Sequence, residues 1–163
     1  MKKLLLAIVV VIAISAVAVW QLPSAAKTAP DVTFTTITGE QVTTQDLRGK
    51  VVLVKFWATS CVTCVAQMPD NINLYNTLKD RGYDTIAVAM QYDPPNYVKN
   101  FTESRELPFK VVVDATGDLA QAFGDVKLTP TAFLIDKEGN IIRRYLGNYD
   151  KDSFLATVEK ALG

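Results

Sequence analysis

Two cysteines, Cys61 and Cys64, are the residues of this chain whose type and spacing best support chemistry. Two residues separate them, they are the only cysteines in the 163-residue sequence, and the chain contains no histidine. Such a pair can serve as a structural disulfide, as part of a metal site or as a redox-active dithiol. The rest of the composition helps to separate these three uses.

A redox role is favoured over the other two. A disulfide between residues three apart closes a very short loop, so it restricts the unfolded chain little. A structural zinc site needs four ligands, mostly cysteine and histidine, which two cysteines without histidine do not provide. Copper can bind two thiolates, but no imidazole is present to complete such a site. A metal-carrying module therefore stays as an alternative only.

The sequence around the cysteines predicts a strand followed by a helix. Residues 49–58 form a continuous apolar run with one charge, Lys55, as is typical of a strand covered on both faces. Residues 61–80 have helical spacing. Cys61 therefore begins the helix, where free N–H groups and the helix dipole stabilise a thiolate, and Cys64 lies one turn further in. We expect Cys61 to attack a disulfide and Cys64 to resolve the mixed disulfide.

Strands and helices alternate along the rest of the chain. A Thr-Gly-Glu turn between β-branched runs predicts a hairpin over residues 31–44. The apolar patterns predict further strands at 83–91, 109–114, 131–136 and 141–147, and helices at 94–107, 116–124 and 150–162. Helices between buried strands, followed by an antiparallel hairpin, predict an α/β fold with a mixed sheet in a three-layer sandwich.

The N-terminal segment has a different composition from the rest. A short basic start precedes a run, residues 4–20, that is apolar except for one serine. We interpret residues 1–22 as a signal anchor or a cleaved signal peptide, residues 23–29 as a tether and residues 30–163 as one domain. An uncleaved segment would anchor the domain outside the cytoplasmic membrane, and cleavage would release it as a secreted protein. Either route exports the cysteines to a compartment where disulfides are common.

The charge balance argues against nucleic acid as a partner. Without the two lysines of the N-terminal start, the 17 basic residues fall to 15, against 17 acidic ones. The remaining net charge of −2 comes with no basic patch that would attract a phosphate backbone.

Several stretches together resemble the thioredoxin superfamily. These are the expected N-terminal hairpin, "LRGKVVLV", "FWATSCVTC", a proline five residues after the second cysteine, and "TPTAFLIDKEGN". They are most similar to its exported, membrane-tethered TlpA/ResA branch, which includes reductases of cytochrome c maturation. The resemblance covers residues 29–162. It implies a thioredoxin-like three-layer α/β/α sandwich with a mixed central sheet and an added N-terminal β-hairpin.

The resemblance also implies residues that support the cysteines. A cis-proline faces the cysteines in this family, and Pro130 is the matching residue. The Thr129 backbone would then face outward, where an extended substrate segment could pair with it; an ordinary trans proline at a strand start is the alternative. Trp57 is expected beside the thiols or in the core. Asp93 is interpreted as part of a helix-start turn, or of a loop near the site.

Several positions depart from the family pattern. Val62-Thr63 lies between the cysteines where many relatives carry a proline, and Ser60 replaces the tryptophan that is frequent before the first cysteine. Lys55 stands where thioredoxins have a buried carboxylate, and there it could favour a thiolate on Cys64 or lose its own proton through burial. Alternatively, its stem lies along the sheet and its ammonium group reaches water. Gln67 stands where many relatives have glutamate. It either replaces that group in a different way or is a helix-surface residue without a role.

We therefore predict an extracytoplasmic thiol:disulfide oxidoreductase that reduces protein disulfides through Cys61 and Cys64. In the branch it resembles, the electrons come from a membrane donor of the thiol-relay type. We expect a monomer with no cofactor other than its own disulfide. A disulfide oxidant or isomerase is one alternative, because the direction depends on relative thiolate stabilities. A non-catalytic copper- or metal-binding module is the other.

Overall fold

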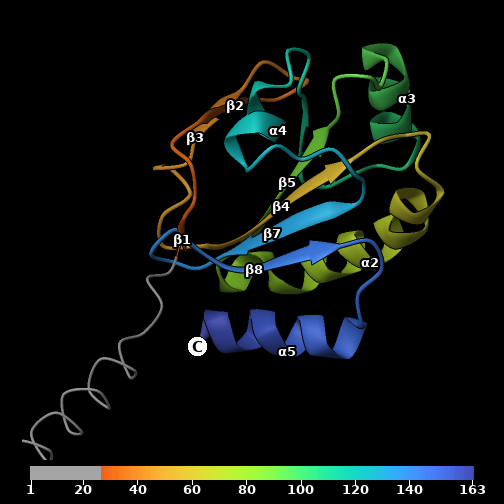
Figure 1. Ribbon diagram of the computed structural model, residues 1–163. Helices are drawn as coiled ribbons and strands as arrows, with labels where there is room; N and C mark the ends of the chain where they lie inside the picture. Colours follow the sequence, from red (N-terminus) through yellow and green to blue (C-terminus); the bar gives the residue numbers. More distant parts are fainter. Residues whose placement is uncertain (1–26) are drawn as a thin grey trace, which may run out of the picture.

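The computed structural model describes residues 27–163 (Figure 1). The expected signal segment, residues 1–22, and the first part of the expected tether lie outside the described residues. The elements follow in the order β1 (Lys27–Thr28), β2 (Thr33–Thr35), β3 (Gln41–Thr43), β4 (Val51–Trp57), α2 (Val62–Leu78), the 3-10 turn η1 (Lys79–Arg81), β5 (Tyr83–Ala89), α3 (Pro95–Ser104), β6 (Lys110–Val113), α4 (Asp118–Ala122), β7 (Thr131–Ile135), β8 (Asn140–Leu146) and α5 (Lys151–Leu162).

The central sheet is mixed, as the sequence predicts. Its strand order is β1-β8-β7-β4-β5-β6. Strands β4, β5 and β6 are parallel, whereas β7 runs antiparallel to β4 and β8, and β1 runs antiparallel to β8. The predicted N-terminal hairpin is present as a separate two-stranded sheet, β2 with β3, in which Phe34 faces Val42. The fold is the predicted α/β fold with a mixed central sheet and an added N-terminal hairpin.

The sheet begins earlier than the domain boundary expected at residue 30. Lys27 pairs with Ile141 and Thr28 with Asn140, and the Ala29 N–H donates to the Gly139 carbonyl over 2.9 Å. These pairs satisfy backbone groups along the edge of β8 that would otherwise lack partners in the sheet. A two-residue strand is too short to show an alternating apolar pattern, so the sequence of these residues does not distinguish this strand from the tether.

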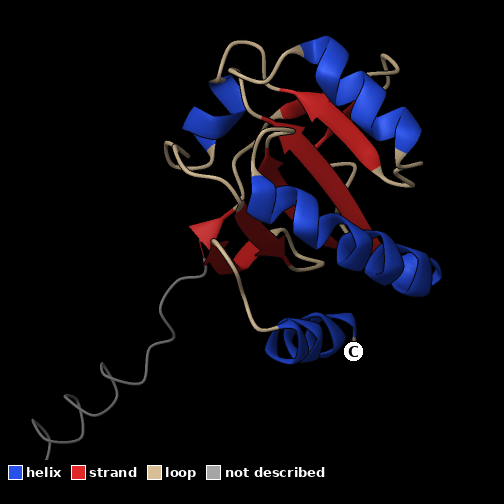
Figure 2. Cartoon of the chain, turned by 90° about the vertical axis from the view of Figure 1, so that its right-hand side faces the viewer, coloured by secondary structure: helices blue, strands red, loops and turns tan. Residues whose placement is uncertain are grey.

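Alternation along β4 divides the core into two sides. Val52, Val54 and Phe56 pack on the side covered by the β2–β3 hairpin and α4. Val51 and Leu53 pack against α2 and α5, while Trp57 packs against α2 and α3. Figures 1 and 2 show the sheet between these two layers. Because side chains alternate along a strand, Lys55 belongs to the side covered by α2.

The helices begin and pack as their sequences indicate. Asp150 caps α5, since its carboxylate accepts a hydrogen bond from the Ser153 N–H over 2.8 Å. Phe154, Val158 and Leu162 are buried at spacings of four residues, which is the apolar stripe of an amphipathic helix. Among residues 27–163, no helix combines the length and the apolar character that crossing a membrane requires.

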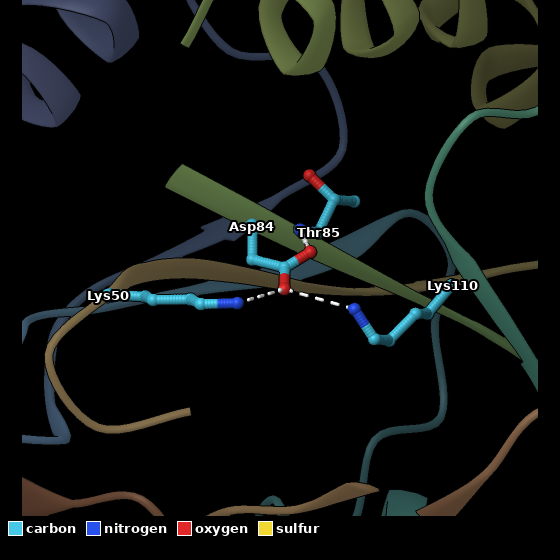
Figure 3. A network of polar contacts seen from close by, with 4 residues as sticks. All are labelled: Lys50, Asp84, Thr85 and Lys110. Atoms are coloured by element: carbon cyan, nitrogen blue, oxygen red, sulfur yellow. Dashed lines mark hydrogen bonds and ion pairs between the residues drawn. The ribbon is translucent and has the colours of Figure 1, made fainter. Parts of the chain in front are cut away.

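A buried charge holds the end of the sheet that is remote from the cysteines. The Asp84 side chain is only 4% exposed and one of its oxygens accepts hydrogen bonds from Lys50 at 3.3 Å and Lys110 at 3.1 Å (Figure 3). Its other oxygen accepts the Thr85 N–H at 2.8 Å. Asp84 pairs with the second residue of β4, which places it about 16 Å along the strand from Trp57.

We expect Asp84→Asn to lower the free energy of unfolding by about 1–3 kcal/mol, because two ammonium groups lose their charged partner. Lys110 should contribute more of this loss than Lys50, since its side chain is 23% exposed rather than 46%. Urea denaturation of the oxidised protein measures the change, with the exposed Asp31→Asn as the matched control. Equal unfolding midpoints for the two variants would show that Asp84 has no such role.

Candidate active site: a disulfide at a strand-to-helix junction

Cys61 and Cys64 are joined by a disulfide, with their Cα atoms 5.2 Å apart. Cys61 has an extended backbone and is the N-cap of α2, and its Sγ accepts a hydrogen bond from the Cys64 N–H over 3.2 Å. Cys61 is half-buried, whereas Cys64 is fully buried. Cys61 is therefore the more exposed of the two residues and Cys64 the shielded one, which is the arrangement that a sequential attack and resolution need.

The strand-to-helix connection sets the position of Cys61. The chain leaves β4 at Trp57, and the Cys61 N–H donates to the Ala58 carbonyl over 3.1 Å, which closes a tight turn. The first turn of α2 contains no acidic residue. The unpaired N–H groups and the positive end of the helix dipole thus act on the Cys61 sulfur without an opposing carboxylate in that turn, and they favour its thiolate.

An apolar cluster surrounds the shielded sulfur. Cys64 packs in one cluster with Trp57, Met68 and Val98. The Trp57 indole is fully buried and its ring centroid lies 5.1 Å from that of Phe101. Trp57 is therefore both a core residue and a neighbour of the disulfide, so the two interpretations of this residue are compatible.

The peptide bond between Thr129 and Pro130 is cis. Pro130 is buried, and Thr129 is half-buried with its hydroxyl 3.3 Å from the Tyr92 hydroxyl. In the antiparallel pairing of β7 with β4, Thr131 lies opposite Phe56. Continuing that register by one residue places Pro130 opposite Trp57, at the end of β4 that leads to Cys61.

Lys55 is buried beneath α2. Only 1% of Lys55 is exposed to solvent, so the interpretation in which its ammonium group reaches water is wrong. The Lys55 Nζ donates to the Gln67 side-chain oxygen over 2.7 Å and lies 6.0 Å from the centre of the Tyr149 ring. Burial lowers the pKa of Lys55 to about 7, while attraction to Asp70 acts in the opposite direction.

Gln67 connects three parts of the structure. Besides accepting from Lys55, its amide nitrogen donates to the Gly147 carbonyl at 3.3 Å and to the Asn148 side-chain oxygen at 3.1 Å. The side chain thus joins β4, α2 and the loop between β8 and α5. Gln67 is half-buried, and it lies three residues after Cys64, where helical geometry puts it on the same face.

Asp93 makes a contact beside the cysteines that a helix-start turn alone does not require. The Asp93 carboxylate accepts hydrogen bonds from the Thr59 N–H at 2.6 Å and from the Thr59 hydroxyl at 2.5 Å. Asp93 does precede a helix, as the turn interpretation requires, but its side chain contacts the loop before Cys61. The signal available in the sequence was that both loops follow neighbouring parallel strands, whose carboxyl ends meet at one edge of a sheet.

Within residues 27–163, no group of three or more cysteine, histidine, aspartate or glutamate side chains is arranged to hold a metal ion.

Comparison with known proteins identifies the family. A family model for Redoxin matches residues 24–162. The chain belongs to the Redoxin family. The redoxin is 34% identical over 134 aligned residues to the thiol-disulfide oxidoreductase ResA of Bacillus thuringiensis subsp. konkukian. This alignment covers 82% of this chain and 76% of the relative. With ResA of Geobacillus kaustophilus it shares 35% over 125 positions, covering 77% and 71%.

A solved structure extends the likeness of this redoxin to three dimensions. A thiol:disulfide interchange protein of the thioredoxin family from Chlorobium tepidum TLS matches with a TM-score of 0.78 and 30% identity, covering 86% of this chain and 99% of that one. The predicted resemblance to ResA-type, thioredoxin-like proteins is confirmed. The relatives and the Cys61–Cys64 disulfide together support oxidoreductase activity for this redoxin.

Proposed function

We propose that this redoxin reduces disulfide bonds of other proteins on the outer side of the cytoplasmic membrane, using the Cys61–Cys64 dithiol. The observation that carries the proposal is the pairing of a half-buried Cys61 at a helix N-terminus with a fully buried Cys64. Relatives over most of the chain are thiol-disulfide oxidoreductases by name. The basic and apolar N-terminal segment supports export, with that segment acting as an anchor or being removed.

The reaction starts from the reduced protein. The Cys61 thiolate attacks one sulfur of a substrate disulfide, a Cys61–substrate disulfide forms, and the other substrate sulfur leaves as a thiolate that takes a proton from water. Cys64, after losing its proton, attacks the Cys61 sulfur. The Cys61–Cys64 disulfide forms, and the second substrate sulfur leaves as a thiolate that takes up a proton, which balances the one that Cys64 released to water. The substrate has gained two electrons and two protons, and the redoxin ends in the oxidised state that this structure shows.

The surrounding residues take supporting parts in this proposal. Thr129 and Pro130 offer a backbone edge beside Cys61 for an extended substrate segment. Trp57 keeps water away from Cys64 through the apolar cluster they share. Lys55 and Gln67 place a titrating group beneath the helix that carries the thiols.

Each reaction cycle leaves the redoxin oxidised, so a donor must restore the dithiol. We infer a membrane partner of the thiol-relay type, because an exported protein has no direct access to cytosolic reductants. A membrane tether would keep the domain at a high effective concentration near such a donor. In this proposal the redoxin acts as a monomer and its dithiol needs no additional cofactor.

The direction of electron flow is tested with two substrates. Reduced full-length protein, freed of dithiothreitol, should reduce the disulfides of insulin, and the amount of insulin thiol formed should match the dithiol consumed. Oxidised protein should transfer its disulfide poorly to a reduced, unfolded dithiol peptide. The reverse pattern, in which peptide oxidation is fast and insulin reduction slow, would make the protein a disulfide oxidant and overturn the proposal.

A further inference from the structure

Asp93 is a buried carboxylate that the proposed reaction does not use. It is 2% exposed and lies in the loop between β5 and α3. Both hydrogen bonds it accepts from Thr59 are short, 2.6 Å to the N–H and 2.5 Å to the hydroxyl. Hydrogen bonds to a charged acceptor are about twice as strong as neutral ones. The loop before Cys61 is therefore held by a strong two-point contact.

The carboxylate does not cap the helix that follows it. Aspartate near a helix start commonly accepts N–H groups of its own helix. In α3 the N-cap is Pro94, and no side chain makes a capping hydrogen bond. By contrast Asp114, which is also buried and follows the next strand, binds the N–H groups of Leu119 and Ala120 at the start of α4. Asp93 thus serves the neighbouring loop rather than its own helix.

The loop that Asp93 holds leads directly to the attacking sulfur. Thr59 is two residues before Cys61 and lies inside the turn closed by the Cys61 N–H and the Ala58 carbonyl. A second bond, from the Met90 N–H to the Trp57 carbonyl at 3.0 Å, fixes the two loops together just before this turn. A shift of Thr59 would therefore move Cys61 relative to the N–H groups at the start of α2.

We propose that Asp93 is a positioning residue for thiol exchange, which holds Thr59 and thereby keeps the Cys61 sulfur aligned with the N-terminus of α2. This inference rests on the proposed function, because it concerns the reactivity of the same sulfur. The helix N-terminus favours the Cys61 thiolate only while the sulfur stays within its first turn. The carboxylate acts through geometry and does not touch the reacting sulfur atoms.

The direction in which thiolate formation at Cys61 changes distinguishes a positioning role of Asp93 from an effect of its charge. Removing a negative charge near a thiol, by itself, makes the thiolate easier to form. Losing the alignment with α2 makes it harder to form. Asp93→Ala removes both the charge and the contact. Asp93→Asn removes the charge but keeps the contact, because the amide oxygen can accept the Thr59 N–H while the amide nitrogen donates to the hydroxyl.

The experiment measures alkylation of Cys61 by iodoacetamide in the reduced full-length protein as a function of pH, with mass spectrometry to identify the modified cysteine. For Asp93→Ala we expect the pH profile to move upward by about one unit, which is about a tenfold loss of thiolate at neutral pH. Asp93→Asn should match the wild type or move downward. Asp114→Ala is the matched control and should lose stability without changing the profile.

A second pair of variants keeps the test decisive if Asp93→Ala does not fold. Thr59→Val retains the shape and the N–H contact but loses the hydroxyl contact, so its alkylation profile should also move to higher pH. Thr59→Ser keeps a hydroxyl that can contact Asp93, so its profile should match that of the wild type. An unchanged or downward profile in folded Asp93→Ala, or in Thr59→Val, would overturn the inference. Alkylation needs neither a substrate nor a direction of electron flow, so this result is independent of the insulin test.

Discussion

Replacing Cys61 with serine should abolish disulfide reduction, lowering the rate with insulin by more than about a thousandfold, because the attacking nucleophile is lost. Cys61 is the half-buried member of the pair and caps α2. A serine hydroxyl stays protonated where a cysteine would be a thiolate, so it does not attack a disulfide. The assay is insulin reduction by pre-reduced protein, with the alkylation of Cys64 followed in parallel.

The companion variant Cys64→Ser should behave differently and serves as the control. Cys61 can still attack, but no thiol is left to resolve the product, so a mixed disulfide with the substrate should accumulate. Mass spectrometry without reductant should show one substrate chain attached at Cys61. If the Cys61→Ser protein instead trapped substrate through Cys64, the assignment of attacking and resolving sulfurs would be reversed.

Replacing Lys55 with methionine should stabilise the protein near neutral pH by about 2–4 kcal/mol. Lys55 is 1% exposed, and burial lowers its pKa to about 7 from the usual 10.5. At or below neutral pH the folded protein must bury an ammonium group, which methionine avoids. The expected gain is less than the full pKa shift implies, because the side-chain oxygen of Gln67 loses its donor. Urea denaturation measures the difference.

The stabilisation should depend on pH with a defined sign. Between about pH 7 and 10.5 the unfolded chain holds a proton on Lys55 that the folded protein has lost, so wild-type stability rises with pH in this window. The advantage of Lys55→Met should therefore be largest below about pH 7 and should shrink towards about pH 10. The exposed Lys79→Met is the matched control. A difference that stays constant with pH would contradict the assignment of a buried, titrating lysine.

Local patterns were sufficient to predict the fold and the reactive pair. The apolar run at β4 with Cys61 and Cys64 just after it, the hairpin around the Thr-Gly-Glu turn, and the alternation of later strands and helices each encode their structure within a few residues. The cis bond before Pro130 was implied by the family resemblance and is present. These features depend on periodicity and short motifs, which are properties of the sequence itself.

The contacts between distant segments were not predictable in the same way. Lys55 and Gln67 meet because α2 covers one side of β4, and Asp93 meets Thr59 because β4 and β5 are parallel neighbours. A lysine within an apolar strand is equally compatible with a buried ammonium and with one that reaches water, until the neighbours of its head group are known. The arrangement of strands and helices, rather than the local sequence pattern, determines which of these distant residues meet and whether the Lys55 ammonium group is buried.

The reduction potential of the Cys61–Cys64 pair tests the central claim most directly. The full-length protein is equilibrated in dithiothreitol or glutathione buffers, and the fraction of reduced protein is determined by alkylation and mass spectrometry. A protein-disulfide reductase should give a value near that of thioredoxin, about −270 mV. A value near about −120 mV, typical of a strong periplasmic oxidant, would show that this redoxin donates disulfides rather than reducing them.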